Sequence, residues 1–311
     1  MGVRLRTSLN NGLNNGLRQS ISGGVSTLAF LEYTTASVSS FRIKAVGTVN
    51  YDVDWGDGST ETGVTAPQKD HTYSSAGVYK IKITPAEGST YHPEQYGVPD
   101  YETNLTKVDG TGGSQLGTTL QKWLRETSSL TSLGKVDTSS VTNFQAAWHG
   151  CTSLTSFPLI DTSSGTNFMN AWLSCSGLTS FPALNVSSGS TFQDSWNGCS
   201  GLTSFPALDM SSGTDFRGAW KNCSSLTSFP ADQFDTTGTL ISSAFSGAFV
   251  NSALTAQSIE NILTSLDTNG AQNITLQIGG GTNAGKSTWS TAANAAYDNL
   301  ITKGWTINFN S

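Results

Sequence analysis

The most regular feature of the chain is a set of apolar positions that returns every 24 residues between residues 144 and 230. Small polar residues and glycines fill most of the positions between them. One unit of this length cannot bury its own apolar side, whereas stacked units bury a continuous core. The pattern therefore predicts a tandem stack of repeats. The recurring positions are Phe144, Phe168, Phe192 and Phe216; Trp148, Trp172, Trp196 and Trp220; Cys151, Cys175, Cys199 and Cys223; Leu154, Leu178, Leu202 and Leu226; and the Phe-Pro pairs beginning at Phe157, Phe181, Phe205 and Phe229.

Within one repeat, the spacing of the large residues predicts a short helix. Phe168, Trp172 and Cys175 fall at i, i+4 and i+7, which is one face of a helix, and the Ser-Ser-Gly at 163–165 marks a turn before it. The segment Leu-Thr-Ser-Phe-Pro at 178–182 predicts a short strand that ends at its proline. Each repeat is therefore expected to contain a strand, a turn and a helix.

The repeat extends beyond its clearest copies. Leu120, Leu124, Leu130 and Leu133 precede the corresponding apolar residues of the next repeat by one step and indicate a degenerate first copy. After residue 230 the register breaks at 231–234, and Phe245 is expected to take a position like that of the tryptophans. The repeat region is therefore predicted to span 120–250.

These repeats resemble the BspA-like leucine-rich repeats, which have an aromatic residue, then a cysteine, then Leu-Thr-Ser and an apolar residue. The resemblance covers about 120 residues, and tryptophan stands where that family more often has phenylalanine. It implies a leucine-rich-repeat solenoid.

Two motifs before the repeats point to a β-sandwich. Residues 41–46 and 78–83 alternate apolar and polar side chains as half-buried strands do, and Gly56-Asp57-Gly58 is typical of a turn. Tyr-Asp-Val-Asp-Trp-Gly-Asp-Gly at 51–58, followed by the segment 70–79, resembles the PKD-type immunoglobulin-like domain. We expect this sandwich at 31–90, with a linker and N-terminal cap at 91–119. The resemblance implies a spacer module.

The residues after the repeats predict a small α/β cap at 251–311. Helical spacing covers 258–266 and 292–300, and strands are expected at 273–278 and 305–309. The ending Gly-Trp-Thr-Ile-Asn-Phe resembles the tail of many repeat proteins in bacteria and phages. The expected fold class is therefore mixed α/β: a β-sandwich, then a leucine-rich-repeat solenoid, then an α/β cap.

Charge narrows the choice of partners. The chain has 22 acidic and 16 basic residues, a net charge of -6, so we expect no nucleic-acid binding. The first twenty residues are locally basic, and residues 1–30 are predicted to form a docking arm whose candidate contacts are Arg4, Arg6 and Arg18. They contain no apolar run typical of a signal peptide, which predicts a protein kept in the cytoplasm until assembly. No apolar segment of membrane-spanning length occurs, so no membrane insertion is expected.

One segment matches a nucleotide-binding motif. Residues 280–287, Gly-Gly-Thr-Asn-Ala-Gly-Lys-Ser, fit the phosphate-loop pattern and follow an expected strand. Such a loop needs a parallel sheet and an acidic magnesium ligand on another strand, yet fewer than thirty residues follow. We therefore favour a Gly-Asn turn, and expect neither a cofactor nor enzymatic activity.

The cysteine and tryptophan columns each allow two interpretations. Zinc sites bring ligands to one point, whereas equal steps place the cysteines in a line, so we expect core thiols rather than a metal site. Adjacent repeats are close enough for a disulfide, but we expect the reduced state. The tryptophans resemble a sugar-stacking platform only superficially, because their helical spacing with phenylalanine predicts burial.

The remaining polar candidates lie at the surface. The outward residues Thr155, Thr179, Thr203 and Thr227 form a candidate contact row, although plain solvated surface is the simpler interpretation. Asp54 and Asp57 are candidate calcium ligands, but turn stabilisation is commoner for such residues. The three histidines, His71, His92 and His149, are too scattered in sequence to predict a catalytic set.

Taken together, these features predict a non-enzymatic bacteriophage virion structural protein: a tail fibre, spike or capsid decoration located in the virion and giving adhesion or assembly contacts. Its expected partners are other virion proteins through the arm, a host-surface glycan or protein, and further copies in a homo-oligomer. The alternative is a leucine-rich-repeat adhesin on the bacterial cell surface. A nucleotide-binding protein that uses 280–287 is the third interpretation.

Overall fold

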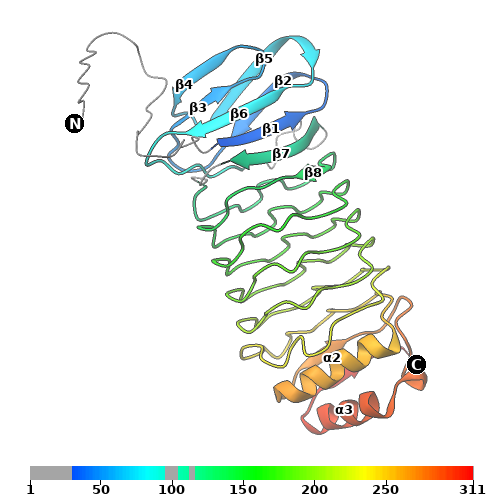
Figure 1. Cartoon of the computed structure of the whole chain (residues 1–311). Coiled ribbons are helices and arrows are strands. Elements are labelled where there is room, and N and C mark those ends of the chain that lie inside the picture. The colour runs from blue at the N-terminus through cyan, green and yellow to red at the C-terminus, as the bar shows by residue number, and fades with distance from the viewer. Residues whose placement is uncertain (1–29, 95–103, 112–115, 311) are drawn as a thin grey trace, which may run out of the picture.

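The computed structural model describes residues 30–94, 104–111 and 116–310. Figure 1 shows an elongated molecule with packed sheets at one end, a stack of coils in the middle and helices at the other end. The docking arm predicted at 1–30 lies outside the described residues, apart from Phe30.

Two sheets pack against each other in the N-terminal part. One has six strands in the order β4-β3-β6-β1-β7-β8, and the other pairs β2 with β5. The side chains of Tyr33 and Phe41 meet between the sheets at 6.3 Å, and the Tyr73 hydroxyl donates to the Trp55 carbonyl. This packing is compatible with the expected sandwich. The strands are β1 Phe30–Thr35, β2 Val38–Lys44, β3 Tyr51–Asp54, β4 Thr60–Val64, β5 Gln68–Gly77, β6 Lys80–Pro85, β7 Leu105–Thr111 and β8 Ser132–Leu133.

The larger sheet runs directly into the coils. Strand β7 pairs antiparallel with β1 on one side and parallel with β8, which belongs to the first coil, on the other. At the same junction the Trp123 indole N–H donates to the Tyr33 hydroxyl over 3.1 Å, where both side chains are buried. The sheets and the stack therefore share one core.

Successive coils lie one 24-residue step apart and are joined by backbone hydrogen bonds. Alternate amides donate to the next coil: Phe144 N to Asn167 O, and Trp148 N to Ala171 O, both near 2.9 Å. The parallel bridges repeat with the same step, so each coil sits directly on the previous one. The bridges join Thr119 with Asn143, Asn143 with Asn167, Asn167 with Thr191, and Thr191 with Asp215.

The helix expected in each repeat is absent. Between Phe168 and Cys175 the amides that do not cross to the next coil close overlapping four-residue turns, such as Ala171 N to Phe168 O. Asn170 and Ser174 have positive φ angles, 58° and 60°, which an α-helix excludes. Left-handed residues at every fourth position place i and i+4 side chains on one side, which imitates helical spacing.

The expected fold class was therefore wrong. The structure is mostly sheet, with two α-helices in the described residues, and 11% of it is helical. Both helices follow the stack, so a leucine-rich-repeat solenoid is not indicated. The expected strand at 178–182 is also absent as a regular element; in this part of the coils a single bridge joins Ser204 to Ser228.

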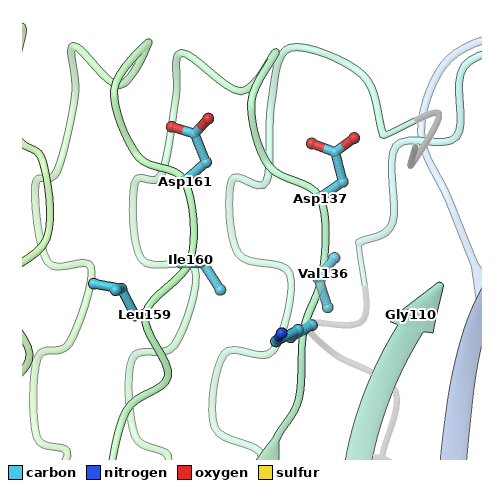
Figure 2. A pocket seen from close by; sticks show the side chains of 7 residues that line it. Gly110, Val136, Asp137, Leu159, Ile160 and Asp161 are labelled. Carbon is cyan, nitrogen blue, oxygen red and sulfur yellow. The ribbon is translucent and has the colours of Figure 1, made fainter. Parts of the chain in front are cut away.

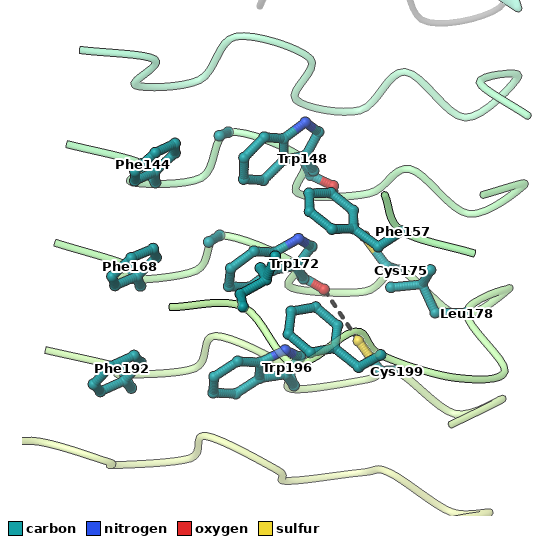
Figure 3. Close-up of a cluster of buried hydrophobic side chains, with 14 of the residues drawn as sticks. Phe144, Trp148, Phe157, Phe168, Trp172, Cys175, Leu178, Phe192, Trp196 and Cys199 are labelled. Atoms are coloured by element: carbon teal, nitrogen blue, oxygen red, sulfur yellow. Dashed lines mark hydrogen bonds between the residues drawn. The ribbon is translucent and has the colours of Figure 1, made fainter. Parts of the chain in front are cut away.

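Columns of stacked rings fill the coils (Figure 3). Trp172 stacks on Trp148 and on Trp196 at 5.4 Å in each case, with interplanar angles of 13° and 7°. Phe181 meets Trp172 edge to face at 4.9 Å. The predicted burial of the tryptophan and cysteine columns is confirmed, because all eight side chains are fully buried.

The phenylalanine and tryptophan columns each continue into one residue of the C-terminal part, but the sequence register differs from the expected one. Phe245 stacks on Phe216 at 5.2 Å, and Phe249 stacks on Trp220 at 5.0 Å. Phe245 thus continues the phenylalanine column, and the prediction that it takes a tryptophan position was wrong. Phe216 and Phe245 are 29 residues apart, so this coil has five residues more than the 24-residue step, which the sequence register alone did not reveal.

The helices and strands expected near the C-terminus are present. Thr255 and Ser290 cap α2 and α3 by accepting hydrogen bonds from Ser258 N and Ala293 N, and Gly270 ends α2 in a left-handed conformation. β9 pairs parallel with β10. None of the described helices is both long and apolar enough to cross a membrane. The elements are α2 Ala256–Asn269, β9 Thr275–Gln277, the 3-10 helix η1 Lys286–Thr288, α3 Thr291–Thr302 and β10 Thr306–Asn308.

Candidate functional surface

The four residues Thr155, Thr179, Thr203 and Thr227, here called the threonine row, are all exposed on successive coils. Their backbones are joined along the stack, since Thr179 N donates to Thr155 O and Thr227 N donates to Thr203 O. The structure therefore places the row as expected, one threonine per coil along one side of the stack.

The hydroxyls of the row are also used within the stack. The Oγ1 atom of Thr179 donates to Thr155 O over 3.3 Å, and that of Thr203 donates to Thr179 O over 3.4 Å. Thr227 and Thr255 continue the same ladder at 3.2 Å. Because these protons are engaged, the hydroxyls offer mainly lone pairs to a partner. The row thus favours groups that donate hydrogen bonds.

A second ladder makes the same kind of bond elsewhere on each coil. Thr142 donates through its hydroxyl to Thr118 O, and Thr166 donates to Thr142 O, both over 3.2 Å. Ser190 and Thr214 continue it at 3.1 Å. We call Thr142, Thr166, Ser190 and Thr214 the second ladder. It provides a structural equivalent of the threonine row on a different part of the coil.

The segment 280–287 is held as a structural loop. It leads into η1, which has three residues, rather than into an α-helix. The Lys286 ammonium lies 3.5 Å from the centre of the Tyr297 ring, so its charge is directed at an aromatic face. A phosphate loop needs free amides, whereas four amides here have partners: Gly280 N with Asn310 Oδ1, Thr282 N with Ser252 O, Ala284 N with Leu254 O, and Lys286 N with Asn310 O.

Asp54 and Asp57 stabilise the turn between β3 and β4. Asp54 accepts a hydrogen bond from Gly56 N, and Asp57 Oδ1 accepts from both the amide and the hydroxyl of Ser59. The hydrogen bonds from Ser59, followed by that from His71, lower the pKa of Asp57. In the part of the chain that the structure describes, no group of three or more metal-binding side chains occurs.

The structure brings His71 close to Asp57 and Ser59, but not in a catalytic arrangement. His71 Nε2 lies 2.8 Å from Asp57 Oδ2 and 3.5 Å from Ser59 Oγ. A proton relay needs the acid and the nucleophile on opposite ring nitrogens, whereas both groups here meet the same one. The ring stacks on Trp55 at 4.7 Å. His71 therefore packs against the turn that contains Asp57 and Ser59.

His92 and His149 are also explained by packing. Burial lowers the pKa of each imidazole, and the neighbouring Arg125 lowers that of His149 further. The two histidines belong to different parts of the chain, and neither is hydrogen-bonded to a described cysteine.

The cysteines form a line of free thiols. Each donates to a carbonyl oxygen in the preceding coil; Cys175 bonds to Trp148 O over 3.0 Å and Cys199 to Trp172 O over 3.2 Å. Burial raises the pKa of Cys175 to about 12, and that of Cys223 equally. The structure thus places all four thiols in the core, as the sequence predicts.

An open pocket of about 460 Å³ lies where the larger sheet meets the first two coils (Figure 2). Asp137 and Asp161 lie side by side on adjacent coils, and Leu159 projects below Asp161. Leu159 is 71% exposed. Sequence reasoning missed this site, although Leu159 stands where later repeats have Ala183, Ala207 and Ala231. The full lining is Gly110, Lys135, Val136, Asp137, Leu159, Ile160 and Asp161.

The predicted arm residues Arg4, Arg6 and Arg18 lie outside the described residues. No protein-family model, curated protein or solved structure matches this chain. Its surfaces must therefore be interpreted from their geometry.

Proposed function

We propose that the chain is a non-enzymatic structural protein of a bacteriophage particle, a tail fibre, spike or capsid decoration that makes adhesion or assembly contacts. The observation that carries the proposal is the threonine row, in which one exposed hydroxyl recurs on every coil of a rigid stack. A partner with its own repeating groups gains avidity from such a row without any single strong contact. A host-surface glycan or protein is such a partner.

The covered ends of the stack support lateral rather than end-to-end contacts. Strand β7 pairs with β8 at the first coil, and β9 bonds to the last one through Gln277 N and Phe245 O. Exposed strand edges would invite open-ended pairing, which covered ends suppress. We therefore place partner binding on the sides of the stack, and expect a closed homo-oligomer in the particle.

The location of the protein tests the proposal directly. Purified particles and envelope fractions of uninfected host bacteria would be compared by quantitative mass spectrometry with an antibody check. We expect the protein in the particles at a fixed copy number. Its presence in uninfected envelopes, with none in particles, would instead identify a bacterial adhesin.

The contact surface is tested with paired variants in a cell-binding assay. Removing two hydroxyls from the row, in Thr179→Val with Thr203→Val, should weaken binding about tenfold, since each lost bond contributes about 0.5–1.5 kcal/mol. The matched control is Thr142→Val with Thr166→Val, which breaks equivalent bonds in the second ladder. Equal losses in both pairs would show that the effect is structural, and would remove the threonine row from the proposal.

A further inference from the structure

The Lys286 side chain is directed at aromatic rings rather than at a carboxylate. Its Nζ atom lies 3.5 Å from the centre of the Tyr297 ring and 5.6 Å from that of the Phe309 ring. Among the residues that the structure describes, none of the ion pairs includes Lys286. The faces of the two rings are therefore the electrostatic partners of this cation.

Trp289, Tyr297 and Phe309 form a group of three rings that we call the aromatic cluster. The Trp289 ring lies 5.1 Å from Phe309 and 5.9 Å from Tyr297, and the Tyr297 and Phe309 rings are 5.6 Å apart. The interplanar angles are 55°, 61° and 89°, so the rings are inclined to one another instead of stacked. Trp289 is buried, whereas the other two rings are partly exposed. These two outer rings can therefore both present a face to one cation that arrives from solvent.

Hydrogen bonds hold the aromatic cluster in place without involving the lysine side chain. The Trp289 indole N–H donates to Ala284 O over 3.3 Å, and Ser290 caps α3, which carries Tyr297. Asn310, directly after the third ring, bonds through its side chain to two backbone groups of the loop before η1. Rings that are fixed in this way bind a cation without the cost of being ordered by it.

A lysine ammonium is a weak occupant of such a site. It is a compact, strongly hydrated charge on a flexible stem, so water can replace the rings as its partner at little cost. A quaternary ammonium group has no N–H group to hydrate, and aromatic faces are the usual means by which proteins recognise it. The chemistry of the rings therefore favours exchange of the Lys286 ammonium for a ligand of this class.

We propose that the aromatic cluster binds a trimethylammonium group, as in choline, at the position that the Lys286 ammonium occupies in the free chain. Lys286 moves into solvent when the ligand binds. In the free chain it competes for the rings and lowers the apparent affinity, because only molecules whose rings are vacant can bind the ligand. This inference does not rest on the proposed function.

Titration of the full chain with tetramethylammonium chloride tests the site, with the indole N–H signal of Trp289 in nitrogen-15-labelled protein as the reporter. We expect a saturable shift in the wild type. Binding should be about five- to tenfold tighter in Lys286→Ala, which removes the competing cation. Lys82→Ala is the matched control, because the Lys82 Nζ atom lies 4.1 Å over the single ring of Phe30. Its affinity for tetramethylammonium should equal that of the wild type.

Two further comparisons separate recognition of a cation from apolar contact. Phe309→Leu keeps an apolar side chain but removes one aromatic face, so binding should weaken about two- to fivefold. The neutral carbon isostere of choline, dimethylbutanol, should shift the Trp289 signal far less than choline does. Unchanged indole signals from the stacked tryptophans would show that each variant is folded. No saturable shift in Lys286→Ala, or an equal response to the neutral alcohol, would overturn the proposal.

Free choline and vesicles of phosphatidylcholine distinguish two sources of the trimethylammonium group. A shift of the Trp289 signal with choline, without cosedimentation with the vesicles, would assign a soluble ligand. Cosedimentation with the vesicles would assign a lipid headgroup, and vesicles of phosphatidylglycerol, which lack the group, are the control. Binding in neither arm would contradict the proposal.

Discussion

The buried thiols illustrate how single residues tie the coils together. Each donates to a carbonyl of the preceding coil, and Ser252 takes the same position in the last coil, donating to Trp220 O over 2.9 Å. The indoles beside them make no such bond: the Nε1 atoms of Trp148 and Trp172, for example, have no acceptor in the described structure. Ring stacking must offset that cost.

The raised thiol pKa values predict a loss of stability at alkaline pH. An unfolded thiol ionises near pH 9, whereas burial keeps Cys175 and Cys223 protonated up to about pH 12. Unfolding therefore releases protons above pH 9, and the free energy of unfolding should fall by about 1.4 kcal/mol per pH unit for each thiol. Urea denaturation between pH 9 and 11 measures this decrease, which approaches the full slope as the pH rises above the pKa of the unfolded thiol.

The variant Cys199→Ser provides the control for that slope. It copies the geometry of Ser252 and removes one of four thiols, so the pH dependence should shrink by about a quarter. An unchanged slope would assign the effect to other groups.

At the scale of elements, the run of turns shows what the sequence could and could not predict. The 24-residue step and the buried columns followed from the spacing of Trp172, Cys175 and their equivalents, and the C-terminal helices followed from the helical spacing at 258–266 and 292–300. The prediction of a helix in each repeat was wrong, because overlapping turns with a left-handed residue at every fourth position also place i and i+4 on one side. The available signal was the recurrence of Asn, Asp and Gly at these positions, as in Asn170, Asp194 and Gly218.

The pocket and the ladders depend on contacts between coils, which a one-dimensional pattern does not contain. That the Thr179 hydroxyl is engaged by Thr155 O follows only from the stacking geometry. Likewise, Leu159 is conspicuous as the exception in its column, but only the structure places it beside Gly110 and the N-terminal strand.

Ala146→Gly distinguishes a run of turns from a helix. Ala146 has a φ of 54°, a conformation that costs a residue with a Cβ atom about 1–2 kcal/mol. Glycine relieves this strain but loses more conformational entropy on folding, so the free energy of unfolding should rise by about 0.5–1 kcal/mol. In a helix, the same substitution would lower the free energy of unfolding by a similar amount. Thermal and urea denaturation give the sign, and destabilisation would contradict the turn geometry.

At the scale of the whole molecule, the sheets and the stack should unfold together. The larger sheet includes β8 of the first coil, and the buried residues of both parts form one continuous cluster. The hydrogen bond between Trp123 and Tyr33 lies inside this junction. Shared cores of this kind favour cooperative unfolding.

Tyr33→Phe should weaken that junction. It removes the acceptor of the buried Trp123 N–H, which should cost about 1–3 kcal/mol and separate the unfolding transitions of sheet and stack. Tyr51→Phe is the matched control, since the Tyr51 hydroxyl is buried without a partner in the described structure, so its removal should be neutral or stabilising. Calorimetry with a second probe on the tryptophans would show whether one transition becomes two. A similar loss of stability in both variants would argue against a specific role of the Trp123–Tyr33 hydrogen bond in joining the sheet to the stack.

The near-identical coils between two dissimilar ends also bear on how the gene can change. A duplication or deletion of 24 codons inside the array would add or remove one coil and leave both ends intact, because each coil contacts only its neighbours. Each event would alter the length of the rod by about 4.8 Å. Recombination between repeats could therefore adjust the distance between the two ends in fixed increments without inventing any new interface.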